Sequence, residues 1–177
     1  HDDPIGGVIK KRRNQGSQSI PTILKWSWRK NMLPRIVHPE QLQGFRLSAG
    51  DHCRLALLST PADGDSGNSD PEAVPSLFLE IHDPCDRVPP HAHHQAAELF
   101  FVLRGQVIFH LKDRAIRSGG GDFVVVPSAT LHDLENPGPG RLYLLTMLSK
   151  DEGFADALMQ GIPTPLDAED LAVLKSL

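Results

Sequence analysis

Three histidines and one glutamate are the residues of this chain with the clearest potential for chemistry. His91 and His93 are separated by one residue, Glu98 follows, and His132 lies further along the chain. Imidazole nitrogens and carboxylate oxygens suit one divalent transition metal, with iron, manganese, nickel, cobalt, copper and zinc all possible. Such a metal would keep open positions and act as a Lewis acid. Glu98 is also the predicted catalytic residue, because a carboxylate that leaves the metal becomes a base.

The elements that must position these residues are expected to be short strands. Side chains alternate between the two faces of a strand, so His91 and His93 would share one face. Glu98 lies an odd number of residues from His93, and residues 94–97 must therefore bend before it can rejoin that face. Asp122–Val126 is predicted as a later strand that stops at Pro127, and a short turn then brings in His132 on a loop.

With these spacings the sequence resembles a cupin. The first motif of that family has two histidines, a glutamate and a glycine, which correspond to His91, His93, Glu98 and Gly105. The second has a glycine, a proline, a histidine and an asparagine, which correspond to Gly121, Pro127, His132 and Asn136. Two positions depart from the pattern, since Cys85 and Ala129 stand where glycine is usual. The resemblance covers residues 76–148 and implies an all-β double-stranded β-helix, or jelly roll, around a pocket.

The strands near the predicted metal supply apolar and aromatic side chains for a substrate pocket. We expect its lining to include Phe100, Val102, Phe109, Phe123 and Tyr143. Few basic residues fall at interior positions, which disfavours a phosphorylated substrate and favours a small apolar or aromatic molecule that chelates through oxygen. The similarity to quercetinase-like single-domain cupins points the same way, to a dioxygenase.

Two other functions stay open at this point. One is a metal-dependent isomerase or lyase that uses Glu98 or Tyr143 as the base and needs no dioxygen. The other is a cupin that binds a small molecule without turning it over.

Domain organisation is predicted from changes in composition along the chain. Residues 1–44 form an N-terminal arm and extension, 45–149 the barrel, and 150–177 a short helical segment. The basic cluster Lys10–Arg13 is interpreted as part of a solvated arm, because it is short and lacks aromatic neighbours, so no nucleic-acid partner is expected. Trp26 and Trp28 alternate with polar residues, and together with the C-terminal helices they offer apolar surface for a homodimer.

The barrel strands are predicted from runs of β-branched and aromatic residues between turns. They are Arg54–Leu58, Ser76–His82, Leu99–Leu103, Val107–Leu111, Asp122–Val126 and Arg141–Leu148. Arg104-Gly105 is predicted as the tip of a hairpin. Pro61–Pro75 is interpreted as a flexible insertion. In the last segment, one helix is expected over Glu152–Gln160, and a second is expected after an N-cap at Asp167.

Overall composition fits a single domain without a membrane partner. The chain has 177 residues and a net charge of −4, which gives no strong field for a polyanion. No stretch approaches the roughly 18 apolar residues that a membrane span requires. Cys53 and Cys85 are too few for a disulfide framework and are expected to be free thiols. We expect a cytoplasmic protein, although a start at His1 leaves open a removed targeting segment.

Overall fold

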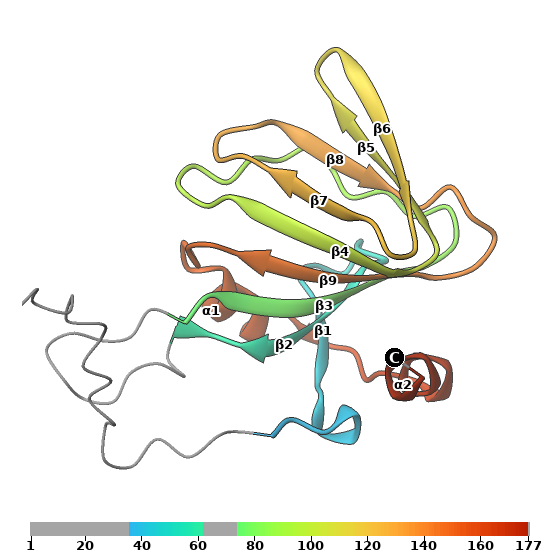
Figure 1. The fold of residues 1–177 in the computed structure, drawn as a ribbon. Helices are drawn as coiled ribbons and strands as arrows, with labels where there is room; N and C mark the ends of the chain where they lie inside the picture. The colour runs from blue at the N-terminus through green and yellow to red at the C-terminus, as the bar shows by residue number, and fades with distance from the viewer. Residues whose placement is uncertain (1–35, 62–73, 177) are drawn as a thin grey trace, which may run out of the picture. The chain divides into compact units, whose positions relative to one another are not determined.

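Two antiparallel sheets form the body of the protein among the residues that the structure describes (Figure 1). The larger sheet has seven strands in the order β10-β1-β2-β3-β9-β4-β7, and the smaller has three in the order β6-β5-β8. The strands are β1 (Gly44–Arg46), β2 (Arg54–Ser59), β3 (Ser76–His82), β4 (Glu98–Arg104), β5 (Gln106–Leu111), β6 (Arg114–Gly119), β7 (Phe123–Val126), β8 (His132–Glu135), β9 (Leu142–Leu148) and β10 (Ile162–Pro163). The predicted all-β jelly roll is thus confirmed.

The computed structural model describes residues 36–61 and 74–176. The Lys10–Arg13 cluster, Trp26, Trp28 and most of the Pro61–Pro75 insertion lie outside the described residues. The interpretations of these segments therefore stay predictions. The homodimer, which was predicted partly from the two tryptophans, also stays a prediction.

Apolar side chains that alternate along the strands build the core between the two sheets. On β4, Phe100 and Val102 are buried, whereas Phe101 between them is 38% exposed. The smaller sheet contributes Val107, Phe109 and Leu134 to the same cluster. Burial of such side chains contributes about 1.5–3 kcal/mol each. This core fixes the two sheets against each other and so fixes the elements that carry the predicted metal ligands.

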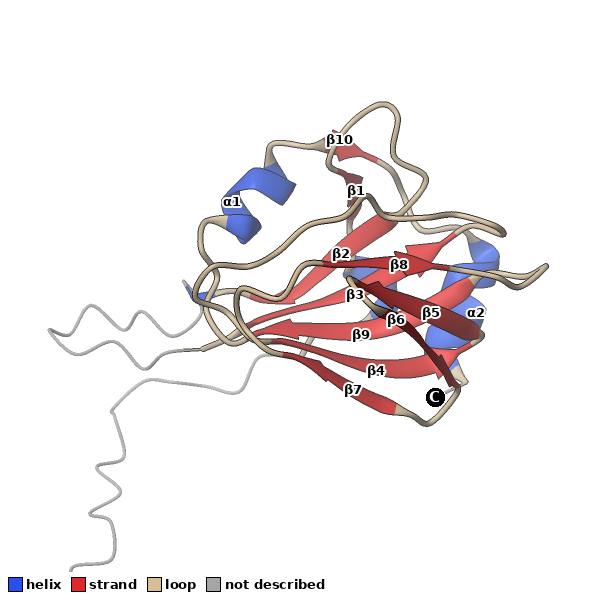
Figure 2. Cartoon of the chain, turned by 90° about the horizontal axis from the view of Figure 1, so that it is seen from above, coloured by secondary structure: helices blue, strands red, loops and turns tan. Residues whose placement is uncertain are grey.

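Within residues 36–61 and 74–176, three short helices accompany the sheets: a 3-10 helix η1 (Pro39–Gln41), α1 (Phe154–Met159) and α2 (Ala168–Lys175). In both views α1 and α2 lie toward opposite ends of the strands (Figures 1 and 2). The predicted N-cap of α2 is confirmed, because the Asp167 carboxylate accepts the amides of Glu169 and Asp170 at 3.0 and 3.1 Å. Helix α1 starts later than predicted, since Glu152 and Gly153 both have positive φ angles.

The C-terminal segment also completes the larger sheet. Strand β10 pairs with β1, with Phe45 opposite Pro163 and Arg46 opposite Ile162. Helix α2 packs on the outer face of this sheet, where Val173 joins a buried cluster with Ala56, Leu79, Ile81 and Tyr143. The segment after the barrel is therefore part of the folded body and more than a helical appendage.

Two local predictions about strands were wrong. Gly105, with φ of 101°, forms a tight turn after β4, but β4 and β5 belong to different sheets, so the turn is a crossover and no hairpin. The hairpin is instead β5–β6, in which Gln106 lies opposite Gly119 and Leu111 opposite Arg114. Strand β6 was not predicted, because its mostly exposed sequence Arg114–Gly119 lacks an alternating apolar pattern.

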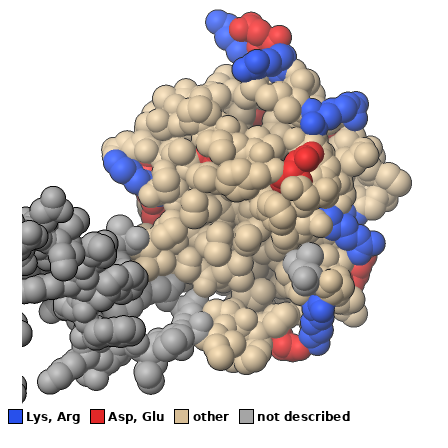
Figure 3. Space-filling view, in the orientation of Figure 1, with Lys and Arg blue, Asp and Glu red and all other residues tan. Residues whose placement is uncertain are grey.

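Charged side chains are scattered over the face shown in Figure 3, without a patch of one sign. In the described part of the chain no helix is both long and apolar enough to cross a membrane.

Candidate metal centre and its cavity

The four predicted metal ligands come together around the carboxylate of Glu98. Its Oε2 atom lies 3.1 Å from His132 Nε2, 3.2 Å from His93 Nε2 and 3.9 Å from His91 Nε2. The ligand atoms of His91, His93 and Glu98 all lie within 4.8 Å of one another. Glu98 and His132 are buried, whereas His91 keeps 34% of its side chain exposed. The site is thus closed on the barrel side and open at His91.

A single β-bridge sets the two halves of the site opposite each other. The amide of His91 donates to the carbonyl of His132 at 2.9 Å, and the amide of His132 donates back at 3.0 Å. Pro89 and Pro90 have no amide hydrogen and interrupt the pairing with β8, which resumes where the Val88 amide donates to the Leu134 carbonyl at 2.9 Å. The strand predicted to carry His91 and His93 is therefore absent. The loop predicted for His132 was also wrong, since His132 is the first residue of β8.

The predicted bend between His93 and Glu98 is present, and a residue that the sequence analysis did not single out holds it. The Glu152 carboxylate accepts the amides of His94 at 3.2 Å and Ala96 at 2.9 Å, and it also accepts the amide of Gln95. Burial acts to raise the pKa of Glu152, but these amides outweigh it and lower that pKa. Nothing in the sequence links Glu152 to this bend, because Glu152 lies 58 residues after His94 in the chain.

The two departures from the glycine pattern keep the backbone conformation that glycine would take. Cys85 and Ala129 have φ angles of 61° and 59°, in the left-handed region. The Ala129 amide donates to the His93 carbonyl at 2.7 Å, so the turn before β8 is tied to a candidate metal ligand. Each such residue costs about 1–2 kcal/mol relative to an unstrained conformation. The site therefore retains its backbone at some cost in stability.

Backbone carbonyls orient two of the imidazole rings. His91 Nδ1 lies 3.0 Å from the carbonyl of Pro89, and His132 Nδ1 lies 2.9 Å from that of Thr130. A ring that donates its Nδ1 hydrogen in this way presents a free lone pair at Nε2, the atom that faces Glu98. The donor set and its orientation fit a divalent transition metal.

Electrostatics keep Glu98 ionised. Burial alone would raise the pKa of this carboxyl, but the imidazoles of His132, His91 and His93, which donate to it when they are protonated, outweigh burial and lower the pKa well below its usual value. The pKa of His91 is shifted the other way: burial acts to lower it, and contact with Glu98 raises it overall. Glu98 is thus an acceptor, either for a metal or for a proton.

A cavity of about 430 Å³ opens beside these residues, and His91, His93 and Glu98 line it. Its apolar wall consists of Leu47, Leu55, Phe78, Val88, Leu134 and Phe154. The five residues predicted to line the pocket are not among the lining residues. Phe100, Val102 and Phe109 are buried in the core between the sheets. Phe123 is 60% exposed on the edge strand β7, and Tyr143 lies under α2 on the outer face of the sheet.

The predicted pocket lining was wrong because period-two alternation does not say which face of a strand looks into the cavity. The cavity is bounded instead by β2, β3 and the loops that precede β2 and β4. Those loops contain few aromatic residues, so nothing in the sequence marked them as part of the pocket wall.

A second polar cluster occupies the β2–β3 side of the cavity. His82 Nε2 lies 3.0 Å from Glu80 Oε2 and 3.7 Å from Cys53 Sγ, while His82 Nδ1 lies 3.3 Å from Asp86 Oδ2. Burial raises the pKa of the Cys53 thiol. Burial acts to lower the pKa of His82, but Cys53 and Asp86 raise it well above its usual value. His82 was predicted only as the last residue of a strand; the available signal was that Glu80 and His82 share one face of β3.

Comparison with known proteins agrees with this architecture. Residues 78–148 match the family model described as the cupin domain. The chain carries a cupin domain. The predicted resemblance is confirmed, and both cupin motifs lie in this stretch, which contains all four clustered ligands. No sequence among the curated proteins matches the chain significantly.

Solved structures show the same cupin fold at low sequence identity. A predicted oxalate decarboxylase from Thermotoga maritima is 20% identical, with a TM-score of 0.53 over 64% of this chain and 97% of that one. An uncharacterized conserved protein with a double-stranded β-helix domain from Klebsiella pneumoniae is 15% identical, with a TM-score of 0.52 over 68% and 93%. At these identities the likeness shows the fold alone.

Proposed function

We propose that this cupin is a mononuclear metal-dependent dioxygenase for a small apolar or aromatic substrate that chelates through oxygen. The proposal rests on one observation above all: two imidazoles and an ionised carboxylate line a largely apolar cavity, and a third imidazole, that of His132, lies 3.1 Å from the same carboxylate. His91, His93, Glu98 and His132 would hold the metal, which would supply Lewis acidity and a place for dioxygen beside the substrate.

The cavity supports a neutral or weakly acidic substrate. Its apolar wall would receive an aromatic or aliphatic body. Its polar wall includes the acidic residues Asp51, Glu80 and Asp86, and its Arg87 is already paired with Asp133 at 2.9 and 3.0 Å. A dianion such as oxalate would be repelled there. A phenol, enol or diketone is repelled less, because it enters neutral and carries a single negative charge after it loses one proton on binding.

Glu98 is the residue that we expect to take that proton. Its carboxylate lines the cavity beside the imidazoles, where it can reach the hydroxyl of a bound substrate. His132 and His93, within 3.1 and 3.2 Å, can share the proton that Glu98 receives. Tyr143 is excluded from this role by its place under α2, which removes one of the two bases considered for an isomerase or lyase.

Oxygen consumption tests the proposal. The metal-loaded protein would be supplied with catechols, flavonols and 1,3-diketones in an oxygen electrode, alongside Glu98→Gln. We expect at least one class to drive oxygen uptake, and Glu98→Gln to slow it by about 10²–10⁴-fold while some metal binding remains.

Glu135→Gln is the matched control, since Glu135 pairs with His110 at 2.7 Å and is not among the residues that line the cavity. Turnover without oxygen uptake would favour an isomerase or lyase that uses Glu98. Tight binding without turnover would favour a binding protein. Full activity in Glu98→Gln would refute the role of that residue.

A further inference from the structure

The second polar cluster of the cavity has the composition of a metal site in its own right. It consists of the thiol of Cys53, the carboxylate of Glu80 and the imidazole of His82, and their ligand atoms all lie within 4.8 Å of one another. Glu80 is 6% exposed and His82 is fully buried, whereas Cys53 is half-buried. Cys53 and Glu80 line the cavity, so the cluster can be reached by an ion.

Strand register explains why the three side chains meet. Glu80 and His82 are two residues apart on β3 and therefore point to the same face. The ladder between β2 and β3 sets Arg54 opposite Ile81 and Leu55 opposite Glu80, which leaves Cys53 beside His82. Arg54 and Ile81 point to the other face, toward α2. Two of the three candidate ligands thus lie within β3, and the third directly precedes β2.

The spacing matches the ligand shell of a small tetrahedral ion. With Zn–N and Zn–S bonds of ordinary length, the nitrogen and sulfur of a tetrahedral site are about 3.6 Å apart. The observed separation between His82 Nε2 and Cys53 Sγ is 3.7 Å. Glu80 Oε2, at 3.0 Å from the same nitrogen, needs to move only slightly. A fourth position would face the cavity, since two of the three ligands line it.

A second carboxylate sets the orientation of the imidazole. Asp86 Oδ2 lies 3.3 Å from His82 Nδ1 and can accept its hydrogen, which directs the Nε2 lone pair toward Cys53 and Glu80. The turn that carries Asp86 is itself fixed: the Asn136 side chain donates to the carbonyls of Asp83 and Gly140, both at 2.9 Å, and the Asn136 amide donates to the Asp86 carbonyl at 2.9 Å. This is the same carboxylate–histidine arrangement that supports ligands in known zinc sites.

We propose that Cys53, Glu80 and His82 form a second metal site, selective for zinc or an ion of similar softness. Selectivity follows from the thiolate, because sulfur ligands prefer such ions, whereas the site around Glu98 offers only nitrogen and oxygen. The second site is independent of the dioxygenase proposal and would stand if that proposal failed.

Cobalt(II) separates the two sites, because a thiolate ligand gives cobalt a strong charge-transfer absorption in the near ultraviolet and imidazole or carboxylate does not. Chelator-treated full-length protein would be titrated with cobalt(II), beside the variants Cys53→Ser, Cys85→Ser and His132→Ala. We expect the wild type to show the absorption and Cys53→Ser to lose it together with one equivalent of cobalt. Cys85→Ser is the matched control and should keep it, since Cys85 is the exposed second thiol.

His132→Ala should lose one equivalent of cobalt and keep the thiolate absorption, which distinguishes the second site from the one around Glu98. A wild type that binds cobalt without this absorption would overturn the proposal, as would its retention in Cys53→Ser. Should Cys53→Ser fail to fold, the wild type itself decides: zinc must slow alkylation of Cys53 and leave that of Cys85 unchanged. Equal alkylation of Cys53 with and without zinc contradicts the site.

Discussion

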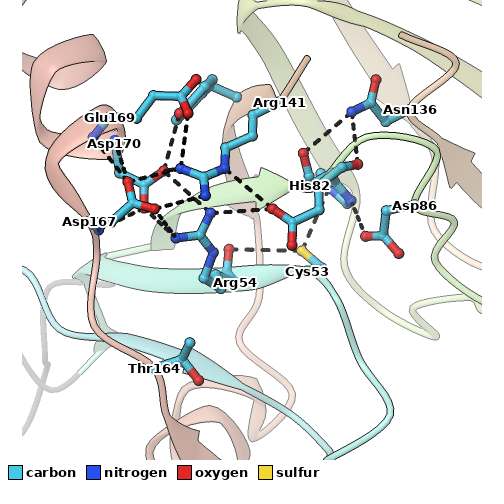
Figure 4. A network of polar contacts seen from close by, with 12 residues as sticks. Cys53, Arg54, His82, Asp86, Asn136, Arg141, Thr164, Asp167, Glu169 and Asp170 are labelled. Carbon is cyan, nitrogen blue, oxygen red and sulfur yellow. Dashed lines mark hydrogen bonds and ion pairs between the residues drawn. The ribbon is translucent and has the colours of Figure 1, made fainter. Parts of the chain in front are cut away.

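The two faces of the β2–β3 strand pair carry polar clusters of contrasting kinds. On the outer face, Arg54 and Arg141 bind the fully buried carboxylate of Asp170 (Figure 4). Tyr143 Oη donates to the same carboxylate at 3.1 Å. On the inner face, Cys53, Glu80 and His82 look toward the cavity instead. Both clusters have a buried centre. They differ in whether the protein alone supplies the partners of their polar atoms.

The outer cluster is complete in itself. Asp83 and Asp167 supply further carboxylates to the two arginines, with Arg54–Asp83 at 3.5 Å and Arg141–Asp167 at 2.7 Å. These bonds raise the pKa of Arg141, while burial and Asp170 raise the pKa of Tyr143 to about 12. Each charge has an opposite partner, so nothing remains for a ligand to satisfy.

The residues beside the cavity form two groups, and in each group the acceptor atoms converge on one another. Glu98 with its histidines, and Glu80 with His82 and Cys53, place lone pairs close together beside a cavity. Such an arrangement is costly unless a proton or a cation lies between the acceptors. The comparison teaches that burial alone does not mark a functional cluster; convergence of ligand atoms beside accessible space does.

The largest effect should come from opening the outer cluster. Asp170→Ala leaves the buried Arg54 and the half-buried Arg141 without their shared partner and should lower the free energy of unfolding by about 3–5 kcal/mol. Urea unfolding followed by circular dichroism measures this loss. Glu169→Ala is the control, because Glu169 is exposed, and it should change stability by less than about 1 kcal/mol. Equal effects of the two substitutions would contradict the account of the outer cluster.

A smaller effect should follow when the bend beside the inner site loses its support. Glu152→Ala leaves the amides of His94, Gln95 and Ala96 without their acceptor. Because this bend sets His93 against Glu98, metal affinity should fall by about 10–100-fold, as for other residues that orient ligands. Calorimetric titration with zinc or manganese measures the change. Unaltered affinity would mean that Glu152 serves the fold alone.

Tyr143→Phe should distinguish the two faces directly. The substitution removes one hydrogen bond to Asp170 and should cost about 0.5–1.5 kcal/mol of stability. Metal content and turnover should not change, because Tyr143 lies on the face opposite the cavity. A loss of turnover at unchanged metal content would return Tyr143 to the list of candidate bases.

The smallest effect should be a loss of stability at acidic pH. The pKa of Asp167 is lowered from 3.8 to about 2, mainly by its hydrogen bond with Arg141. A lowered folded-state pKa stabilises the fold fully above the unfolded value, and that contribution disappears as the pH falls from about 4 through 2. Since 47% of the Asp167 side chain is exposed, the change should stay below about 1 kcal/mol. Asp167→Asn, which keeps the N-cap, should flatten this part of the pH profile; an unchanged profile would contradict the assignment.

The sequence carried enough information for the fold and for the convergence of the four predicted ligands. Motif spacing fixed His91, His93, Glu98 and His132, and the strand pattern located most of the barrel. Sequence distance hid the rest. Glu152 supports a bend that is distant in the sequence. Phe100 and Tyr143 lie on strands as predicted, but their side chains do not point into the cavity. Cys53 meets His82 only through the β2–β3 register. Alternation gives relative facing along one strand, and only pairing between strands says which face encloses the cavity.

The central claim is that Glu98 and its three histidines hold one metal ion, and elemental analysis tests it most directly. Wild-type protein and His132→Ala would be purified without a tag, reconstituted identically, and measured for iron, manganese, nickel, cobalt, copper and zinc. We predict that His132→Ala keeps its circular dichroism spectrum and contains one equivalent less metal than the wild type. Equal metal content in the two proteins, or a wild type that binds none after reconstitution, would contradict the claim.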